Sequence, residues 1–222
     1  MICSGAILST METTTRGSLS GRRAQAAHND RQILDAARAV FIADPGAPIS
    51  AVAKRAGVGI SALYRRYASK EELLQRLATD GLRRYIAEAE AALANDGDPW
   101  IAFAEFMRRI VEADTHSLVQ RLAGTFTPSE ELTRDAAMSH ELARRIVDRA
   151  KAAGVVRGDL VTDDLSLLFE QLASIRVGDA ERTSQLRNRY LALFLDALHD
   201  ATAAALPGPG PAPTELSGRW VR

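Results

Sequence analysis

A cluster of polar and basic side chains between residues 61 and 70 is the part of this sequence best suited to chemistry. Hydroxyl, ammonium and guanidinium groups can contact phosphate oxygens, and an arginine can instead pair with a guanine edge in the major groove. Small residues near them would permit a close approach to DNA. The cluster consists of Ser61, Ala62, Tyr64, Arg65, Arg66 and Lys70. These residue types favour recognition of double-stranded DNA over catalysis.

Two short helical patterns at about residues 48–67 must position this cluster. Gly57 lies between them and supplies the left-handed backbone that ends the first helix. Leu63 and Tyr67 are expected to face inward from the second helix. This leaves the cluster members from Ser61 to Arg66 on or near its outer side, while Lys70 falls in the first turn of the next helix. A helix, a turn at a glycine and a second short helix form the pattern of a helix-turn-helix.

Helix-start signals flank this motif. Asn29 is a predicted N-cap for a first helix, and Ser69 with Glu72 forms a capping box that starts the helix after the motif. We therefore predict a helix-turn-helix domain over residues 28–79. Before it, residues 1–27 are polar and lack apolar periodicity, so we expect a disordered leader in which either Met1 or Met11 could be the start of translation.

The remainder of the chain also predicts helices, so the expected fold class is all-α. Aromatic residues make up only 5% of the sequence, and alternating runs typical of strands are missing. A larger helical domain is expected over residues 80–206, followed by a Pro- and Gly-rich tail over 207–222. The helical patterns of this larger domain lie at about 99–113, 116–124, 129–153, 162–177 and 180–204.

Charge is unevenly distributed along the chain, although the net charge is zero. From Arg16 to Lys70 there are ten Lys and Arg residues but only three acidic residues, so the rest of the chain is acidic. This segregation is expected of a nucleic-acid-facing unit carried on an acidic body.

Several other classes of protein are not favoured. Cys3 is the single cysteine, and neither His116 nor His140 lies in a recognised metal or acid–base spacing, so we expect no metal, no cofactor and no enzyme activity. No secretory signal or membrane-spanning run is recognisable. The sequence therefore predicts a cytoplasmic protein that does not enter the membrane.

The helix-turn-helix and the residues around it resemble a known family, the TetR family of bacterial transcriptional regulators. The resemblance is close over residues 29–75 and rests on a specific combination. This combination comprises Ala53, Ala56-Gly57-Val58, Leu63-Tyr64, Tyr67 and Ser69-Lys70-Glu71-Glu72-Leu73. It implies that Tyr64 and Lys70 contact the DNA backbone, while the other members of the polar cluster lie where contacts vary within the family.

Two departures from the family pattern concern the starts of the motif's helices. Pro48 stands where many members have threonine, and Gly59 replaces a common serine, so two hydroxyls that could touch phosphate are missing. Ser50 could supply part of this contact. We therefore include Ser50 and Gly59 among the predicted DNA-binding residues.

The resemblance further implies a homodimer joined by the last two helices as a four-helix bundle, here at about 162–177 and 180–204. The sequence supports this independently, because both helices carry wide apolar stripes. We expect Leu191 and Leu195 to lie at the outer edge of the last helix. Burial of these stripes within a single subunit is the alternative. The stripes consist of Leu165, Leu168, Phe169, Leu172 and Ile175, and of Leu186, Tyr190, Leu193, Phe194, Ala197 and Leu198.

A pocket for a small-molecule effector is expected between the middle helices. Aromatic and methionine side chains would form its walls and a few polar side chains would orient the ligand, although each residue could equally be core. The candidates are Trp100, Phe103, Phe106, Met107, His116, Gln120, Phe126, Met138, His140 and Phe169.

Together these features predict a ligand-responsive transcriptional regulator, namely a repressor that a small-molecule effector releases from a palindromic operator. The alternative is a helical small-molecule-binding or interaction protein that uses its helix-turn-helix only for packing. Salt-dependent operator binding separates the two.

Overall fold

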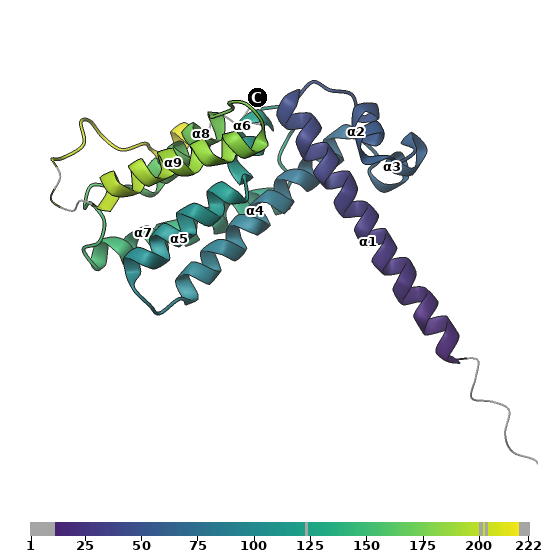
Figure 1. Cartoon of the computed structure of the whole chain (residues 1–222), viewed down its shortest axis with the longest axis horizontal. Coiled ribbons are helices and arrows are strands. Elements are labelled where there is room, and N and C mark those ends of the chain that lie inside the picture. Colours follow the sequence, from purple (N-terminus) through teal and green to yellow (C-terminus); the bar gives the residue numbers. More distant parts are fainter. Residues whose placement is uncertain (1–11, 123, 200–201, 203, 218–222) are drawn as a thin grey trace, which may run out of the picture.

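The computed structural model describes residues 12–122, 124–199, 202 and 204–217, and this described part is built of helices without strands. The predicted all-α fold is confirmed (Figure 1). The helices are α1 (Glu12–Ala43), α2 (Ile49–Ala56), α3 (Ile60–Arg66), α4 (Lys70–Ala94), α5 (Pro99–Glu112), α6 (Thr115–Leu122), α7 (Glu130–Ala152), α8 (Thr162–Ser174), α9 (Ala180–His199) and α10 (Pro213–Ser217). Among these, no helix is long and apolar enough to cross a membrane.

Two hydrophobic cores divide the molecule. The N-terminal core is formed by α1, α2, α3 and the first half of α4, and the body core by the second half of α4 with α5, α7, α8 and α9 (Figure 1). Helix α4 runs through both, with Leu77 buried in the first core and Tyr85 and Ala89 in the second. A single continuous helix therefore joins the two parts.

The predicted helix-turn-helix is present as α2 and α3. Gly57 ends α2 with a left-handed φ of 68°, and its amide donates to carbonyls of the last turn of that helix. Leu63 and Tyr67 are both buried, as expected from their spacing. The glycine turn thus directs α3 so that its remaining side chains point away from the core.

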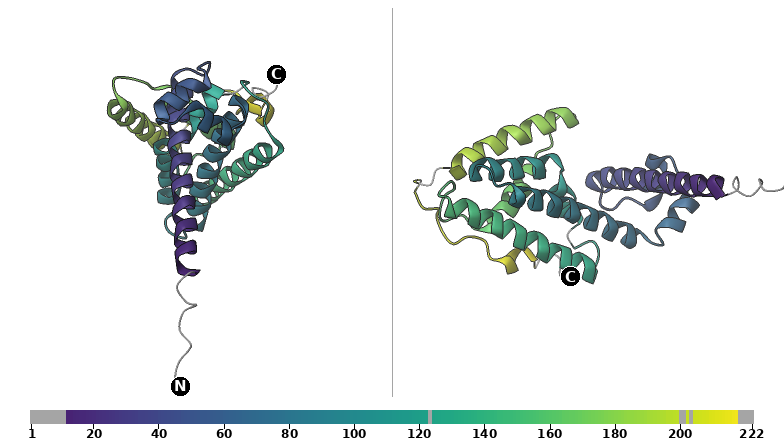
Figure 2. Two further views of the ribbon diagram at one scale, coloured as in Figure 1. Left: turned by 90° about the vertical axis from the view of Figure 1, so that its right-hand side faces the viewer. Right: turned by 90° about the horizontal axis from the view of Figure 1, so that it is seen from below.

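Helix α1 differs from the prediction. It begins at Glu12, so Asn29 lies inside the helix instead of capping its start, and the predicted leader is helical over residues 12–27. Residues 1–11 lie outside the described part. In Figure 1 and in the left view of Figure 2, the N-terminal half of α1 extends away from the rest of the molecule. The sequence of this half carries no apolar periodicity, so a helix was not predicted there.

The short helix α6 belongs to both parts of the molecule. Leu118 and Leu122 from α6, and Phe126 from the loop that follows, are buried in the N-terminal core. At the other end of α6, the His116 ring contacts Tyr85 and Phe169 in the body. Helix α6 therefore contributes to both parts of the molecule, although the sequence predicts that residues 80–206 form one regulatory domain.

Helix α8 is three residues shorter than predicted at the turn that leads to α9, whereas α9 begins where predicted. Helix α8 ends at Ser174 because Ile175 has an extended backbone, and the Ile175 carbonyl accepts a hydrogen bond from Arg187 Nε (3.2 Å). Helix α9 starts at Ala180 after Asp179, whose carboxylate accepts from the Arg182 amide (2.8 Å). The prediction for α9 extended to 204, but residues 200, 201 and 203 lie outside the described part.

The predicted orientation of α9 is partly wrong. Leu191 and Leu195 are buried in the body core, with 1% and 3% exposure, and do not lie on an outer edge. The outward-facing apolar residues of α9 are Tyr190 and Leu193, with 46% and 55% exposure. The stripe is wide because it covers two faces, of which one packs inside the subunit.

The Pro- and Gly-rich tail follows the surface of the body. Arg157 Nη2 donates to the Ala204 carbonyl (2.7 Å), and the Leu206 amide donates to Asp159 (2.7 Å). At Gly210 an added Cβ would lie 2.6 Å from a methyl group of Val161, so this close approach requires glycine. The sequence predicts this tail but not its fixed path or the helix α10.

Candidate functional site

The outer face of α3 gathers the side chains that the sequence selects for DNA recognition. Tyr64 is 49% exposed, and Ser61, Arg65 and Arg66 are also exposed, whereas Ala62 is half-buried. Lys54 and Arg55, near the end of α2, are exposed as well. The helix-turn-helix therefore presents hydroxyl and guanidinium groups to solvent beside further positive charge, as DNA binding requires.

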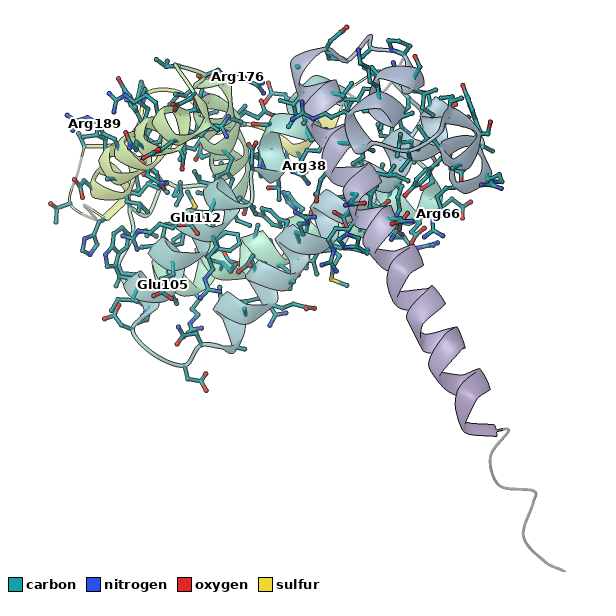
Figure 3. All side chains as sticks on the ribbon, turned by 45° about the vertical axis from the view of Figure 1, so that its right-hand side comes forward. Arg38, Arg66, Glu105, Glu112, Arg176 and Arg189 are labelled. Atoms are coloured by element: carbon teal, nitrogen blue, oxygen red, sulfur yellow. The ribbon has the colours of Figure 1, made fainter. Side chains whose placement is uncertain are left out.

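Arg66 is held in position by the first helix. Its Nε donates to Asp30 Oδ1 at 2.8 Å, and the Tyr67 hydroxyl donates to the same oxygen at 2.6 Å. The hydrogen bond from Arg66 lowers the pKa of Asp30, and burial raises the pKa of Tyr67. The Arg66 side chain remains 51% exposed, so its other nitrogens can still reach a partner. Figure 3 shows Arg66 at the end of the molecule that carries α2 and α3.

The Lys70 ammonium group makes hydrogen bonds within the protein. Its ammonium donates to the carbonyls of Pro45 and Ala47, at 2.9 and 2.8 Å, and lies 5.1 Å from the centre of the Phe41 ring. These contacts offset the unfavourable position of a cation in the first turn of a helix. One of the three ammonium protons remains for a phosphate oxygen.

The starts of α2 and α3 lack side-chain caps. Pro48 and Gly59 occupy the two N-cap positions. Neither residue has a side-chain acceptor for a backbone amide of the helix that it precedes. Ser50 follows Pro48 in the first turn of α2 and is exposed. Ser50 and Gly59 are thus both exposed to solvent, and their contact with DNA stays a prediction.

Carboxylates near this surface are engaged inside the protein. The Ser69 side chain accepts from the Glu72 amide (3.0 Å), and Glu72 in turn accepts from the Ala68 amide (2.7 Å), which confirms the predicted capping pair in a slightly shifted form. Glu71 accepts from the amide of Thr127 (3.3 Å) in the loop after α6. Positive charge therefore dominates what α2 and α3 offer to a partner.

A small cavity lies in the body beside the start of α6. Its volume is about 10 Å³, which suffices for about one water molecule. Among the predicted pocket residues only His116 and Phe169 line it. The remaining lining residues are Ile110, Val111, Asp114, Leu172, Ala173 and Arg187.

The other predicted pocket residues do not meet in one cavity. Phe103, Phe106 and Met107 are packed in the body core, and Phe126 belongs to the N-terminal core. The side chain of Gln120 lies outside the described part. Apolar periodicity places such residues on a buried face but does not distinguish a packed core from a cavity wall.

The three remaining candidates lie apart from the cavity. Trp100 stacks on His199 with ring centres 3.9 Å apart, Met138 is 52% exposed, and His140 Nε2 faces Asp163 at 3.4 Å. Trp100, Met138 and His140 therefore do not line the small cavity, and their contact with a ligand stays a prediction. In the described ranges no group of three His, Cys, Asp or Glu side chains could hold a metal ion.

Asp114, at the corner between α5 and α6, connects the cavity with both ends of the fold. Arg187 of α9, which is 9% exposed, donates Nη1 to Asp114 Oδ1 at 2.8 Å and Nη2 to Ser117 Oγ at 3.2 Å. Arg38 of α1 donates to the Asp114 carbonyl at 3.1 Å. Arg38 lies where the N-terminal part meets the body (Figure 3).

The backbone of this corner is unusual. Asp114 has a φ of 50°, and no other non-glycine residue among those described has a positive φ. Burial lowers the pKa of Arg38, and its Nη2 is buried without a hydrogen-bond partner in the described part of the chain. Asp114 thus binds the buried guanidinium of Arg187 and the partly buried guanidinium of Arg38, and it connects α1, α6 and α9.

Comparison with known proteins supports this assignment of parts. Residues 33–77 match the family model "Bacterial regulatory proteins, tetR family", and residues 98–200 match "Transcriptional regulator SbtR-like, C-terminal domain". The chain belongs to the TetR family. No curated protein matches the sequence.

Several solved structures share the fold. A TetR regulatory protein from Mycobacterium vanbaalenii is 28% identical, with a TM-score of 0.55 over 80% of this chain and 98% of that one. LfrR from Mycobacterium smegmatis, solved in complex with proflavine, is 19% identical, with a TM-score of 0.55 over 81% and 99%. A gamma-butyrolactone receptor is 20% identical, with a TM-score of 0.58 over 80% and 92%.

Sequence reasoning about this TetR protein missed Arg38, Asp114 and Arg187. A signal for Arg187 was present, because it precedes the buried Leu191 and Leu195 at intervals of four residues and is therefore an arginine on an apolar helix face. Asp114 carried no such signal, since its role depends on a backbone conformation and on two distant arginines.

The half-buried His116 should make this TetR protein sensitive to acid. Burial lowers the pKa of His116 from 6.5 to about 4, so the folded state keeps the ring neutral while the unfolded chain binds a proton below about pH 6.5. The free energy of unfolding should be highest above pH 7 and fall toward pH 4, by up to about 3 kcal/mol from this group. Urea unfolding of the native protein and His116→Gln at several pH values should show a weaker pH dependence in the variant.

His28→Gln provides the control, because His28 is exposed. This variant should keep the native pH dependence. An identical pH dependence for His116→Gln and the native protein would contradict the role given to His116.

Proposed function

We propose that this protein is a ligand-responsive transcriptional repressor that binds a palindromic operator as a homodimer in the cytoplasm. A small-molecule effector would change the relative positions of the two recognition helices, so that they no longer fit the major grooves of the two half-sites. Membership of the TetR family supports a role in transcription. The dimer, the operator and the effector are parts of the proposal.

The exposed face of α3 is the observation that carries DNA binding. A helix-turn-helix used only for packing would cover this face, yet Tyr64, Arg65 and Arg66 are all exposed. The ion pair with Asp30 also fixes Arg66. Arg65 has no ion pair with a described residue, so it is the freer of the two arginines to pair with a base edge. A fixed phosphate contact beside an adaptable base contact suits sequence recognition.

The outward faces of α8 and α9 support the dimer. Tyr190 and Leu193 are exposed on α9, and an open groove of about 280 Å³ separates Phe194 and Ala197 of α9 from Leu168 of α8. A two-fold interface on this face would cover the groove and bury the exposed side chains twice. The dimer would also double the number of base pairs read.

The cavity and the Asp114 corner support control by an effector. The cavity is far smaller than the ~300 Å³ or more of ordinary ligand sites, so a ligand would have to open it. Opening would displace Asp114 and Arg187, which form part of its wall, and thereby the carbonyl that holds Arg38 of α1. The solved LfrR complex with proflavine supports a small-molecule effector for this fold.

Replacing Lys70 by glutamine tests DNA binding through its salt dependence. Lys70→Gln removes the charge but keeps a donor for the carbonyls of Pro45 and Ala47. On an operator found by footprinting the DNA around the gene, the slope of log K against log salt should fall by about one. Lys151→Gln is a matched control, since Lys151 donates to the Leu160 carbonyl in the body, and should keep the native slope.

An unchanged slope for Lys70→Gln would remove Lys70 from the interface. Failure of the native protein to bind any operator with a salt dependence would overturn the proposed DNA-binding function itself.

The Asp114 corner should couple the body to DNA binding. Asp114→Asn keeps a residue type that tolerates positive φ but leaves Arg187 without its carboxylate. Loosening of the corner should lower operator affinity by at least about fivefold, the lower range of allosteric coupling. Fluorescence anisotropy should show this loss, whereas Asp148→Asn, which alters an exposed ion pair on α7, should leave affinity unchanged. Equal affinities for both variants would count against coupling through this corner.

The proposed dimer interface predicts different results for a glutamate placed at two nearby positions of α9. Leu193→Glu places a charge on the exposed face and should give a folded monomer that no longer binds the operator, whereas Leu191→Glu buries the charge in the subunit core and should unfold the protein. Sedimentation velocity and circular dichroism at micromolar concentration measure both. A native protein that sediments as a monomer would refute the proposed interface.

A further inference from the structure

Ile60 is an apolar residue at an exposed position of α3. It is the first residue of the helix and is 40% exposed, whereas Leu63, one turn later, is fully buried. Tyr64 follows Ile60 at the helical spacing that places two side chains on one face, and it is 49% exposed. Ile60 therefore contributes a β-branched apolar group to the same outer face that carries the polar cluster.

This position limits what Ile60 can contact. In a helix-turn-helix, the N-terminal residues of the recognition helix approach base edges in the major groove. An isoleucine has no donor or acceptor for phosphates or for the polar edges of bases. The one apolar group that B-DNA presents in this groove is the 5-methyl group of thymine. The basic residues Arg65 and Arg66 on the same helix supply the attraction to DNA that an apolar contact lacks.

We propose that Ile60 packs against a thymine 5-methyl group and so selects thymine at one position of each operator half-site. This inference rests on the proposed DNA-binding function and adds a base identity to it. It gives α3 two kinds of reading contact: an apolar one at its start and a guanidinium at its end. The half-site should accordingly contain a required thymine opposite the start of α3.

Replacing single thymines by deoxyuridine tests this contact directly, because uracil keeps the base pair and removes only the methyl group. Each thymine of the footprinted operator would be replaced in turn, symmetrically in both half-sites, and binding of the full-length protein measured by fluorescence anisotropy. At one position, loss of the methyl should weaken native binding about fourfold per half-site, the value of one buried methyl group.

Ile60→Ala should lose this sensitivity. At the thymine in question the variant should bind the thymine and uracil operators equally, while the effects of all other replacements match those of the native protein. Ile60→Val, which keeps the branched carbon, should retain most of the sensitivity. Ile101→Ala is the matched control, since Ile101 is 52% exposed on α5 of the body, and should reproduce the native profile at every position.

The outcomes separate the inference from the function on which it depends. If no thymine shows an effect of uracil that depends on residue 60, while native protein still binds its operator, the Ile60 contact is refuted and the DNA-binding function stands. If native protein binds no operator, both are refuted. Thermal unfolding of Ile60→Ala should match that of the native protein, because the side chain belongs to neither core.

Discussion

The arrangement of the two parts depends on the contacts that the buried Arg187 and the partly buried Arg38 make with Asp114. A buried guanidinium is costly unless its charge and its donors are satisfied. Arg187 meets this requirement with Asp114, Ser117 and two carbonyls, which fixes the end of α8, the turn into α9 and the start of α6 together. Arg38 then joins α1 to the same corner. Removing the Asp114 carboxylate would leave the buried Arg187 charge without its counter-ion, so we expect these contacts to form and break together.

A second set of internal contacts shapes the proposed DNA-binding surface. Asp30, Glu71 and Glu72 are turned toward partners within the protein, and they leave the cations of α2 and α3 facing solvent. The same contacts set the positions of Arg66 and of the start of α4. Preorganised side chains lose less conformational entropy on binding than mobile ones do. The surface thus combines fixed groups with freer ones such as Arg65 and Ile60.

Local signals in the sequence were sufficient to predict the helix-turn-helix and the all-α fold. Gly57, the capping pair at Ser69 and the inward spacing of Leu63 and Tyr67 each act within a few residues. The effector pocket was less predictable because an apolar stripe looks the same whether it lines a core or a cavity. Leu191 and Leu195 show this difficulty, since the wide stripe on α9 faces both the subunit core and solvent. The path of the tail depends on long-range hydrogen bonds that periodicity does not contain, and the N-terminal half of α1 has no apolar periodicity from which a helix could be predicted.

The continuity of α4 has a mechanical consequence. A helix of 25 residues is about 37 Å long, and it carries the helix-turn-helix near one end while the other end is embedded in the body. As a rigid rod pivoting at its embedded end, it would convert a tilt of about 5° into a displacement of about 3 Å at the far end, close to the rise of one base pair. Leverage of this kind means that a rearrangement of only a few tenths of an ångström beside the pivot is enough to shift the alignment of α3 with DNA.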